Sequence, residues 1–271
     1  MKSIAVIQAR MASKRLPGKA LMKLDGLQLI LHVIASGKKI QGIDEVILAT
    51  SSNEENNELE KIARVTDIDV FRGAEEDVVG RFCAIANSKS ADYIVRLTGD
   101  NPLHDSDIIS RLLRNHIESK KDYTCITGLP VGTGADIFSR KAITLSSEKG
   151  DGNKMADSVD QYVLEHPNSF KILHLNVVPS LSHYRFSIDT KEDFERMQIL
   201  FNTIGSKIND LSIPELIKEI HQKNLVEIAC PKKIEISNAN KYTEKLLSKL
   251  ETKNVILDDY EMNRIKTDCH L

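Results

Sequence analysis

Short apolar and β-branched runs alternate with helical patterns through the first two hundred residues of this chain. The predicted strands are residues 4–8, 45–49, 69–71, 93–97, 123–127, 170–176 and 184–188. The predicted helices are residues 27–36, 54–65, 77–88, 106–118 and 155–165. Strands and helices in this order form a mainly parallel sheet, because each crossover helix packs back on one face of it. The sequence therefore predicts an α/β fold of three layers, with helices on both faces of the sheet.

The C-terminal quarter of the chain has a different pattern. A helix is predicted after Asp189, and Ser212-Ile213-Pro214-Glu215 is typical of the start of another, with proline in its first turn. Beyond residue 235 the chain is polar and rich in lysine. Its main apolar residues there are Leu246, Leu247 and Leu250. We expect a main domain over residues 1–205 and a helical extension over residues 206–271 that packs on the core or on the second subunit of a homodimer, with the last dozen residues disordered.

The charge of the chain is nearly balanced. Lys and Arg number 37 against 39 Asp and Glu, which gives a net charge of −2. So small a net charge provides no general attraction to nucleic acid or to an anionic membrane. We therefore expect neither as a partner, and a site for an anion has to be local.

Membrane segments and disulfides are not expected either. No apolar stretch approaches the roughly 18 residues of a membrane helix, and the N-terminus enters a strand without a signal-peptide core. The cysteines Cys83, Cys125, Cys230 and Cys269 lie far apart and form no CxxC pair. Reduced thiols and a cytoplasmic location are the simplest expectation.

A basic loop follows the first predicted strand directly. It is Arg10-Met11-Ala12-Ser13-Lys14-Arg15-Leu16-Pro17-Gly18-Lys19. In open α/β sheets, ligands bind outside the carboxyl ends of the strands. Guanidinium groups hold phosphate oxygens there, and Gly18 lets the backbone approach closely, so the loop is predicted to bind a polyanion. The alternative is a solvated basic loop. As exposed loop cations, Arg15 and Lys19 are expected to contribute little to stability.

Two further predicted strands end in an aspartate. Asp100 follows the strand at 93–97, and Asp189 follows the strand at 184–188. Mg²⁺ binds to one or two protein carboxylates and completes its octahedron with phosphate and water. Taken singly, Asp100 could be a turn residue and Asp189 a helix N-cap. Together with the basic loop, they predict a magnesium site for a phosphorylated ligand.

Four motifs occur in an order that resembles a known family. They are Gln8-Ala9-Arg10-Met11 with Arg15-Leu16-Pro17-Gly18-Lys19; Arg72-Gly73 with Glu76-Asp77-Val78 and Arg81; Arg96-Leu97-Thr98-Gly99-Asp100 with Pro102-Leu103; and Ser187-Ile188-Asp189-Thr190 with Asp193. Over roughly residues 3–200 the chain resembles the spore-coat-polysaccharide (SpsF-type) cytidylyltransferases, relatives of the CMP-sugar synthetases for Kdo and sialic acids. The resemblance implies a fold like that of the nucleotide-diphospho-sugar transferases, CTP as donor, Mg²⁺ as cofactor and pyrophosphate as product.

The resemblance also implies a role for each matching residue. Gln8 and Ala9 would face the base and ribose of CTP. The triphosphate would be held by Arg10, Ser13, Arg15 and Lys19. Asp100 and Asp189 would hold the metal, and Asp77, Arg81 and Arg96 would lie near the nucleotide. Catalysis is expected from Arg15, Lys19 and Asp100, because in-line attack on the α-phosphorus requires positioning and charge neutralisation rather than a protein nucleophile.

The acceptor side departs from the family pattern. A motif like Asp-Gly-Leu-Asp-Val-Glu-Val-Phe is matched by Val131-Gly132-Thr133-Gly134-Ala135-Asp136-Ile137-Phe138, in which two acids are missing or shortened. A motif like Glu-His-Val-Thr is matched by Asp157-Ser158-Val159-Asp160, which has lost the histidine. A small acceptor for surface polysaccharide or glycan synthesis is expected, and a nonulosonic acid, a phosphorylated molecule and a phosphonate all remain open.

Two other functions remain open. One is a glycosyltransferase that uses a nucleotide-sugar on the same fold, and the other is a catalytically silent binding protein. Asp105-Ser106-Asp107 is similar to a glycosyltransferase metal motif, but its place at the start of the predicted helix 106–118 favours capping. His104, next to Asp105, could contact the substrate, but an exposed position in the loop is expected because it is more common.

Overall fold

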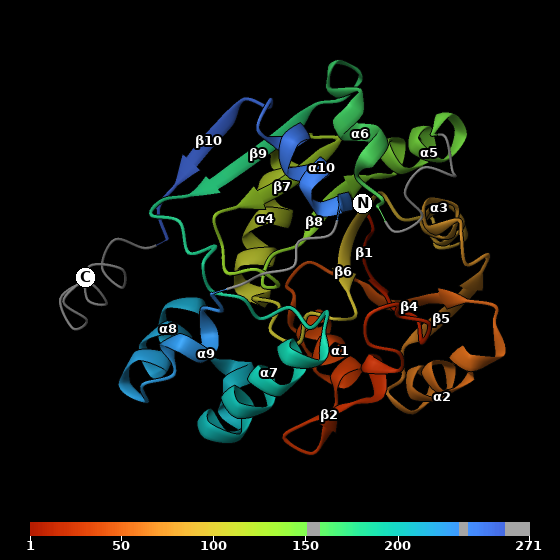
Figure 1. Ribbon diagram of the computed structural model, residues 1–271. Coiled ribbons are helices and arrows are strands. Elements are labelled where there is room, and N and C mark those ends of the chain that lie inside the picture. Colours follow the sequence, from red (N-terminus) through yellow and green to blue (C-terminus); the bar gives the residue numbers. More distant parts are fainter. Residues whose placement is uncertain (151–157, 233–237, 258–271) are drawn as a thin grey trace.

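The computed structural model describes residues 1–150, 158–232 and 238–257. Its centre is an eight-stranded sheet with the order β10-β9-β7-β8-β6-β1-β4-β5 (Figure 1). These strands are β1 (Ser3–Gln8), β4 (Glu45–Ser51), β5 (Asp69–Gly73), β6 (Tyr93–Thr98), β7 (Tyr123–Thr127), β8 (Asp136–Ser139), β9 (Ile172–Val177) and β10 (Thr252–Val255). All neighbours are parallel except the two pairs that β8 forms with β6 and β7. The mainly parallel α/β fold is confirmed.

The helices connect and cover these strands. They are α1 (Leu29–Lys39), α2 (Asn57–Val65), α3 (Val78–Ser88), α4 (Ser106–Glu118), α5 (Arg140–Lys149), α6 (Gln161–Glu165), α7 (Lys191–Ile204), α8 (Ile213–Gln222), α9 (Val226–Ala229) and α10 (Asn238–Leu247). A small hairpin of β2 (Lys23–Leu24) and β3 (Leu27–Gln28) precedes α1. None of the helices in the described ranges combines the length and apolar composition that a membrane span requires.

Strand β1 shows why both faces of the sheet are covered. Its residues Ile4 and Val6 belong to an apolar cluster with α3, α5, α6 and α10. Ala5 and Ile7 belong to a second cluster with α1, α2 and α4. All four side chains are fully buried, and successive side chains of a strand point to opposite faces. A strand that is apolar on both faces needs helices on both sides, as the three layers provide.

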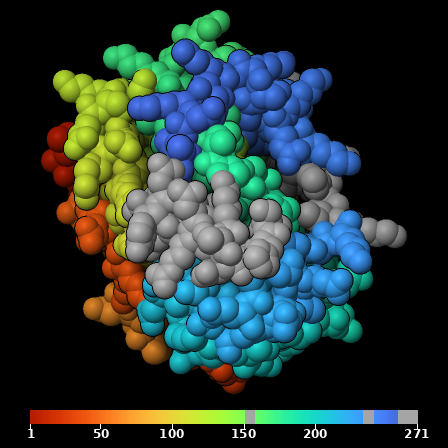
Figure 2. Space-filling model, turned by 90° about the vertical axis from the view of Figure 1, so that its left-hand side faces the viewer, coloured from red at the N-terminus to blue at the C-terminus, as the bar shows by residue number. Residues whose placement is uncertain are grey.

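A third apolar cluster joins the C-terminal helices to the segment before α7. Phe201 of α7 and Ile217 of α8 are buried in it with Phe186 and Ile188. The predicted division at residue 205 falls between α7 and α8, inside this cluster, and stays a prediction. The C-terminal third forms much of the described surface on the face in Figure 2.

The extension contains the expected helices and one unexpected strand. Ser212 caps α8 in a capping box with Glu215, which confirms the predicted helix start. Leu246 of α10 is buried in the first cluster, and Leu247 and Leu250 pack against it, so this segment packs on the core. Strand β10 then adds to the sheet beside β9. The last dozen residues lie outside the described residues.

Residues 184–188 are not a strand of the sheet, contrary to the prediction. Their alternation is real, because the side chains of Tyr184, Phe186 and Ile188 are buried. However, the backbone bonds of this segment go to separate partners, Val131, Ala229 and Asp100, and form only one isolated bridge. Extended chain without a continuous ladder partner is not a sheet strand.

Other differences concern short elements. Strand β8 and helix α5 were not predicted. The predicted helix 155–165 begins only at Gln161, after Ser158 and Asp160, and residues 155–157 lie outside the described residues. The remaining predicted strands and helices are found within a few residues of their expected bounds.

Candidate active site

The carboxyl ends of β1 and β6 border a cavity of about 730 Å³. The turn after β6 lies directly on the end of β1, where the Gly99 amide donates to the Gln8 carbonyl at 2.8 Å. A Cβ on Gly99 would lie only 2.6 Å from the Cβ of Ala9, so a glycine is required for this approach. All predicted site residues except Asp77 line the cavity: Gln8, Ala9, Arg10, Ser13, Arg15, Lys19, Arg81, Arg96, Asp100 and Asp189.

Backbone hydrogen bonds fold the basic loop back on itself. The Met11 carbonyl accepts from the amides of Ser13 and Gly18, both at 2.9 Å. The Met11 amide in turn donates to Asn56 Oδ1 at 2.9 Å. Gly18 has a φ of +73°, in the left-handed region that favours glycine. The loop cations are therefore carried on a defined backbone turn.

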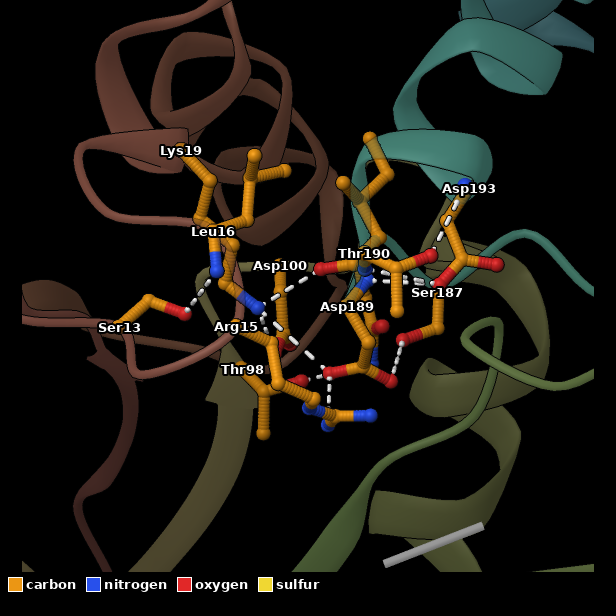
Figure 3. Close-up of polar contacts among 12 residues, drawn as sticks. Ser13, Arg15, Leu16, Lys19, Thr98, Asp100, Ser187, Asp189, Thr190 and Asp193 are labelled. Carbon is orange, nitrogen blue, oxygen red and sulfur yellow. Dashed lines mark hydrogen bonds and ion pairs between the residues drawn. The ribbon is translucent and has the colours of Figure 1, made fainter. Parts of the chain in front are cut away.

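Two loop cations meet two aspartates in one cluster, which Figure 3 shows in close-up. Lys19 Nζ lies 2.8 Å from Asp100 Oδ2 and 3.6 Å from Asp189 Oδ1, and donates to the Ile188 carbonyl at 2.7 Å. Arg15 Nη2 lies 2.8 Å from Asp189 Oδ1. The Lys19 side chain is only 12% exposed, so the expectation for exposed loop cations does not hold for Lys19.

Arg185 and Asp193 fix the orientation of Asp189. Its Oδ2 accepts from Arg185 Nη2 at 2.5 Å, which leaves Oδ1 for Arg15 and Lys19. Asp193 Oδ2 accepts from the Asp189 amide at 3.0 Å, while its Oδ1 accepts from Arg185 Nε at 3.3 Å. The Ile188 amide donates to the Asp100 carbonyl at 2.9 Å, which ties the two aspartate segments together.

The donor set at this cluster fits a hard cation that arrives with phosphate. Asp100 and Asp189 both lie within 4 Å of the Lys19 ammonium, so they already share one positive charge. Burial raises the pKa of Asp100, but the Lys19 ammonium and the hydrogen bonds from Thr98 and the backbone together leave this pKa below its usual range. Groups of three or more His, Cys, Asp or Glu suited to a metal are absent from the described residues. Two carboxylates are the number that Mg²⁺ uses when substrate supplies other ligands.

Arg96 and Asp136 form a second charged group in the same cavity. They face each other across the antiparallel β6–β8 pair, with Arg96 Nη1 3.1 Å from Asp136 Oδ2. Arg96 Nε also donates to Gln8 Oε1 at 3.2 Å, and the Tyr123 hydroxyl donates to Asp136 Oδ1 at 3.0 Å. Burial and the nearby charge of Asp160 raise the pKa of Asp136 to about 6, although Arg96 opposes the shift.

Asp77 and Arg81 have structural contacts beside the cavity. Asp77 Oδ1 accepts from the Gly80 amide at 2.7 Å and caps α3, and Asp77 does not line the cavity. Arg81 does line it, and Arg81 Nη1 donates to the Glu75 carbonyl at 3.0 Å. Glu75 Oε1 accepts from Arg10 Nη1 at 3.1 Å, so Arg81 is linked to the basic loop through residue 75.

His104 is buried, contrary to the expectation of an exposed loop residue. Only 6% of it is exposed, and its ring nitrogens lie 3.0 Å from the Gly134 carbonyl and 3.3 Å from the Thr98 carbonyl. It therefore links the turn after β6 to the loop before β8. Asp105 accepts from the Ile108 amide at 2.9 Å, which confirms capping of α4.

The prediction of site residues missed one wall of the cavity. Tyr123, Asp160, Thr243 and Leu247 line it but were not named. The match of Asp157-Ser158-Val159-Asp160 to an acceptor-side motif was the available signal for Asp160. No sequence signal pointed to Thr243 and Leu247, because α10 (Asn238–Leu247) is far from the other residues of this wall along the chain.

Comparison with known proteins identifies the family. A family model described as cytidylyltransferase matches residues 4–235. The spore coat polysaccharide biosynthesis protein SpsF of Bacillus subtilis is 32% identical over 219 residues, 78% of this chain and 91% of SpsF. The 3-deoxy-manno-octulosonate cytidylyltransferase of Alteromonas mediterranea is 27% identical over 175 residues, 62% of this chain and 69% of that protein. A cytidylyltransferase structure from Leptospira borgpetersenii aligns with a TM-score of 0.78 at 26% identity, covering 87% of this chain and 100% of that one. These matches confirm the resemblance found in the motifs, and the chain belongs to the cytidylyltransferase family.

Proposed function

We propose that this protein transfers a cytidylyl group from CTP to a small acceptor, with Mg²⁺ as cofactor and pyrophosphate as the leaving group. The observation that carries the proposal is the cluster of Lys19, Arg15, Asp100 and Asp189 at the carboxyl edge of the sheet. Cations that bind phosphate and carboxylates that bind a metal are the two requirements of this reaction. The acceptor class is a sugar acid, a phosphorylated molecule or a phosphonate, for surface polysaccharide or glycan synthesis.

The two cations and the two carboxylates of the cluster have different proposed roles. An acceptor oxygen attacks the α-phosphorus of CTP, the bond to the bridging oxygen of the β-phosphate breaks, and pyrophosphate leaves. Arg15 and Lys19 neutralise the charge that develops on the leaving oxygens. Asp100 and Asp189 hold the Mg²⁺, which supplies positive charge to the phosphate oxygens when bound.

The other predicted residues would bind and orient the nucleotide. Gln8 and Ala9 lie at the end of β1, where the base and ribose would sit, and Arg96 holds Gln8 through its hydrogen bond. Arg10 and Ser13 would complete the triphosphate site on the basic loop. Arg81 acts on the position of Arg10 through Glu75. Asp77, as a helix cap, would only position the start of α3 beside the nucleotide.

Family membership favours cytidylyl transfer over the glycosyltransferase alternative, because the matching family model, the relative from Alteromonas mediterranea and the structure from Leptospira borgpetersenii are all described as cytidylyltransferases. A cytoplasmic location, where CTP is made, stays part of the proposal.

Pyrophosphate release measured with each of the four NTPs, Mg²⁺ and an acceptor panel tests this function. We expect release only with CTP, and an increase of the melting temperature with CTP and Mg²⁺ that ATP does not produce. Equal shifts with ATP would overturn the cytidylyl assignment. Sugar transfer from a nucleotide-sugar without pyrophosphate release would favour the glycosyltransferase.

A further inference from the structure

One wall of the cavity takes no part in the proposed nucleotide chemistry. It is lined by Tyr123 of β7, Asp136 of β8, Asp160 before α6, and Thr243 and Leu247 of α10. These residues come from β7, β8, the segment before α6, and α10. The proposed phosphate and metal residues come instead from the basic loop, the turn after β6 and the segment before α7. We call this wall, together with Ser158, the distal wall.

Helix α10 is held firmly in the distal wall. Leu246 is 8% exposed and packs in the same cluster as Val163 and Leu164 of α6. The Tyr242 hydroxyl donates to Glu165 Oε1 at 2.8 Å. These anchors point Thr243 and Leu247, on the same helix, into the lining of the cavity. The family model ends at residue 235, so this part of the wall belongs to the chain's own C-terminal extension.

The two carboxylates of the distal wall are not equally satisfied. Asp136 has a guanidinium partner on one oxygen and a phenolic donor on the other. Asp160 is only 6% exposed, and its Oδ1 accepts from the Ser158 hydroxyl at 2.6 Å. In the described part of the chain, its Oδ2 has no hydrogen-bond partner and the carboxylate has no ion pair. Because Asp160 lines the cavity, this oxygen can accept a hydrogen bond from a donor group bound there.

The charge of the distal wall also favours a ligand group that donates a hydrogen bond. Asp136 and Asp160 are close enough for the charge of Asp160 to raise the pKa of Asp136, and Arg96 provides one positive charge for the two. An added carboxylate or phosphate at this wall would be repelled and could not donate a hydrogen bond. A hydroxyl or an ammonium would donate to Asp160 and satisfy it.

We propose that the distal wall is the acceptor subsite, and that it binds a hydrogen-bond-donor end of the acceptor, hydroxyl or ammonium, while it excludes a carboxylate. This inference rests on the proposed cytidylyl transfer. It narrows the acceptor to a molecule whose anionic group lies at the Arg15–Lys19 end of the cavity and whose other end is a polyol or an amino alcohol. Thr243 and Leu247 would set the length of that end.

Three synthetic product analogues test the inference on the full chain. They are the cytidine diphosphate esters of glycerol, of glyceric acid and of 3-amino-1,2-propanediol, which differ only in a terminal hydroxyl, carboxylate or ammonium. Binding of each, measured by calorimetry with Mg²⁺ and compared with CMP, isolates the terminal group because the cytidylyl part is constant. We expect the hydroxyl or the ammonium ester to bind about tenfold more tightly than the carboxylate ester. Whichever of the two binds more tightly identifies the charge of the donor.

Variants distinguish a specific effect of the distal wall on binding from a general loss of structure. In Asp160→Asn the discrimination against the carboxylate ester should fall to about twofold or less. Thr243→Trp should weaken the binding of all three esters without weakening the binding of CMP. Lys245→Trp, at an exposed position of the same helix, should change neither the binding of the esters nor that of CMP.

The outcomes distinguish the two proposals. If CMP and CTP bind but the wild-type protein binds the three esters equally, or prefers the carboxylate, the acceptor inference is overturned and the cytidylyl function stands. If neither CMP nor CTP binds, the cytidylyl function fails and the inference fails with it.

Discussion

Replacement of Lys19 by methionine tests the charge cluster most directly. Methionine keeps the apolar stem but removes an ammonium that lies 2.8 Å from Asp100, 2.7 Å from the Ile188 carbonyl and 3.6 Å from Asp189. The side chains of Lys19, Asp100 and Asp189 are 12%, 28% and 13% exposed, so solvent compensates the loss only in part. A hydrogen bond to a charged group contributes about 1.5–3 kcal/mol, and breaking a fully buried pair costs about 3–5 kcal/mol. For this partly buried cluster we expect the free energy of unfolding to fall by about 3 kcal/mol, or roughly 6–12 °C in Tm.

The assay is thermal and urea unfolding at pH 7 without nucleotide, alongside pyrophosphate release. Lys14→Met is the matched control, because Lys14 lies in the same loop, is exposed, and has no ion pair in the described residues. Its stability should change by less than about 0.5 kcal/mol. Lys19→Met should also lose most of its turnover, since the charge on the leaving group is no longer neutralised.

Divalent cations provide a second readout of the same variant. In Lys19→Met, Asp100 and Asp189 have lost the ammonium that they share. About 10 mM MgCl₂ should therefore raise the Tm of Lys19→Met more than that of the wild type. Equal stability of Lys19→Met and Lys14→Met would show that the Lys19 ammonium is solvated, and would refute the coupling drawn from these distances.

Further substitutions test other parts of the site. Arg185→Gln removes the partner of Asp189 Oδ2, so the KM for Mg²⁺ in pyrophosphate release should rise several-fold; an unchanged KM would contradict this positioning role. Gly99→Ala brings a Cβ to 2.6 Å from that of Ala9, which should cost about 1–3 kcal/mol in urea unfolding, and the Ala9→Gly change in the same chain should recover part of it. The pKa of Asp136 is raised to about 6, so the folded state favours its protonated form, and the free energy of unfolding should fall as the pH rises from 4 to 6. Asp136→Asn should remove this slope in urea titrations at several pH values, and a slope that persists would assign it to another group.

The sequence predicted those parts of the fold that have a local signal. Runs such as Ile4–Ile7 are apolar at every position, which indicates a strand buried on both faces. Strand β8 was missed because its four residues, Asp136–Ser139, begin and end with polar residues. Helix α5 was missed because only Ala142, Ile143 and Ser146 are buried along ten mostly polar residues.

The same limit applies to the site. The contact of Lys19 with Asp100 and Asp189 was predicted because each residue follows a predicted strand, and such residues lie at one edge of the sheet. In the structure, however, Asp189 is positioned by Arg185 and not by a sheet strand. The contact between Arg96 and Asp136 depends on β8 entering antiparallel beside β6, and no pattern within either segment encodes that pairing. The roles of these residues stay predictions.

Strand β10 has a consequence for shortened forms of this protein. It forms one outer edge of the sheet, with four residues of which Thr252, Lys253 and Asn254 are exposed (Figure 1). A short, polar edge strand with a lysine resists pairing with a second chain. A chain that stops at residue 235, where the family match ends, would leave β9 as the edge instead, six residues long and containing Leu173, Leu175 and Val177. Such a protein would present an apolar strand with unpaired backbone groups, and self-association in solution would be its first defect.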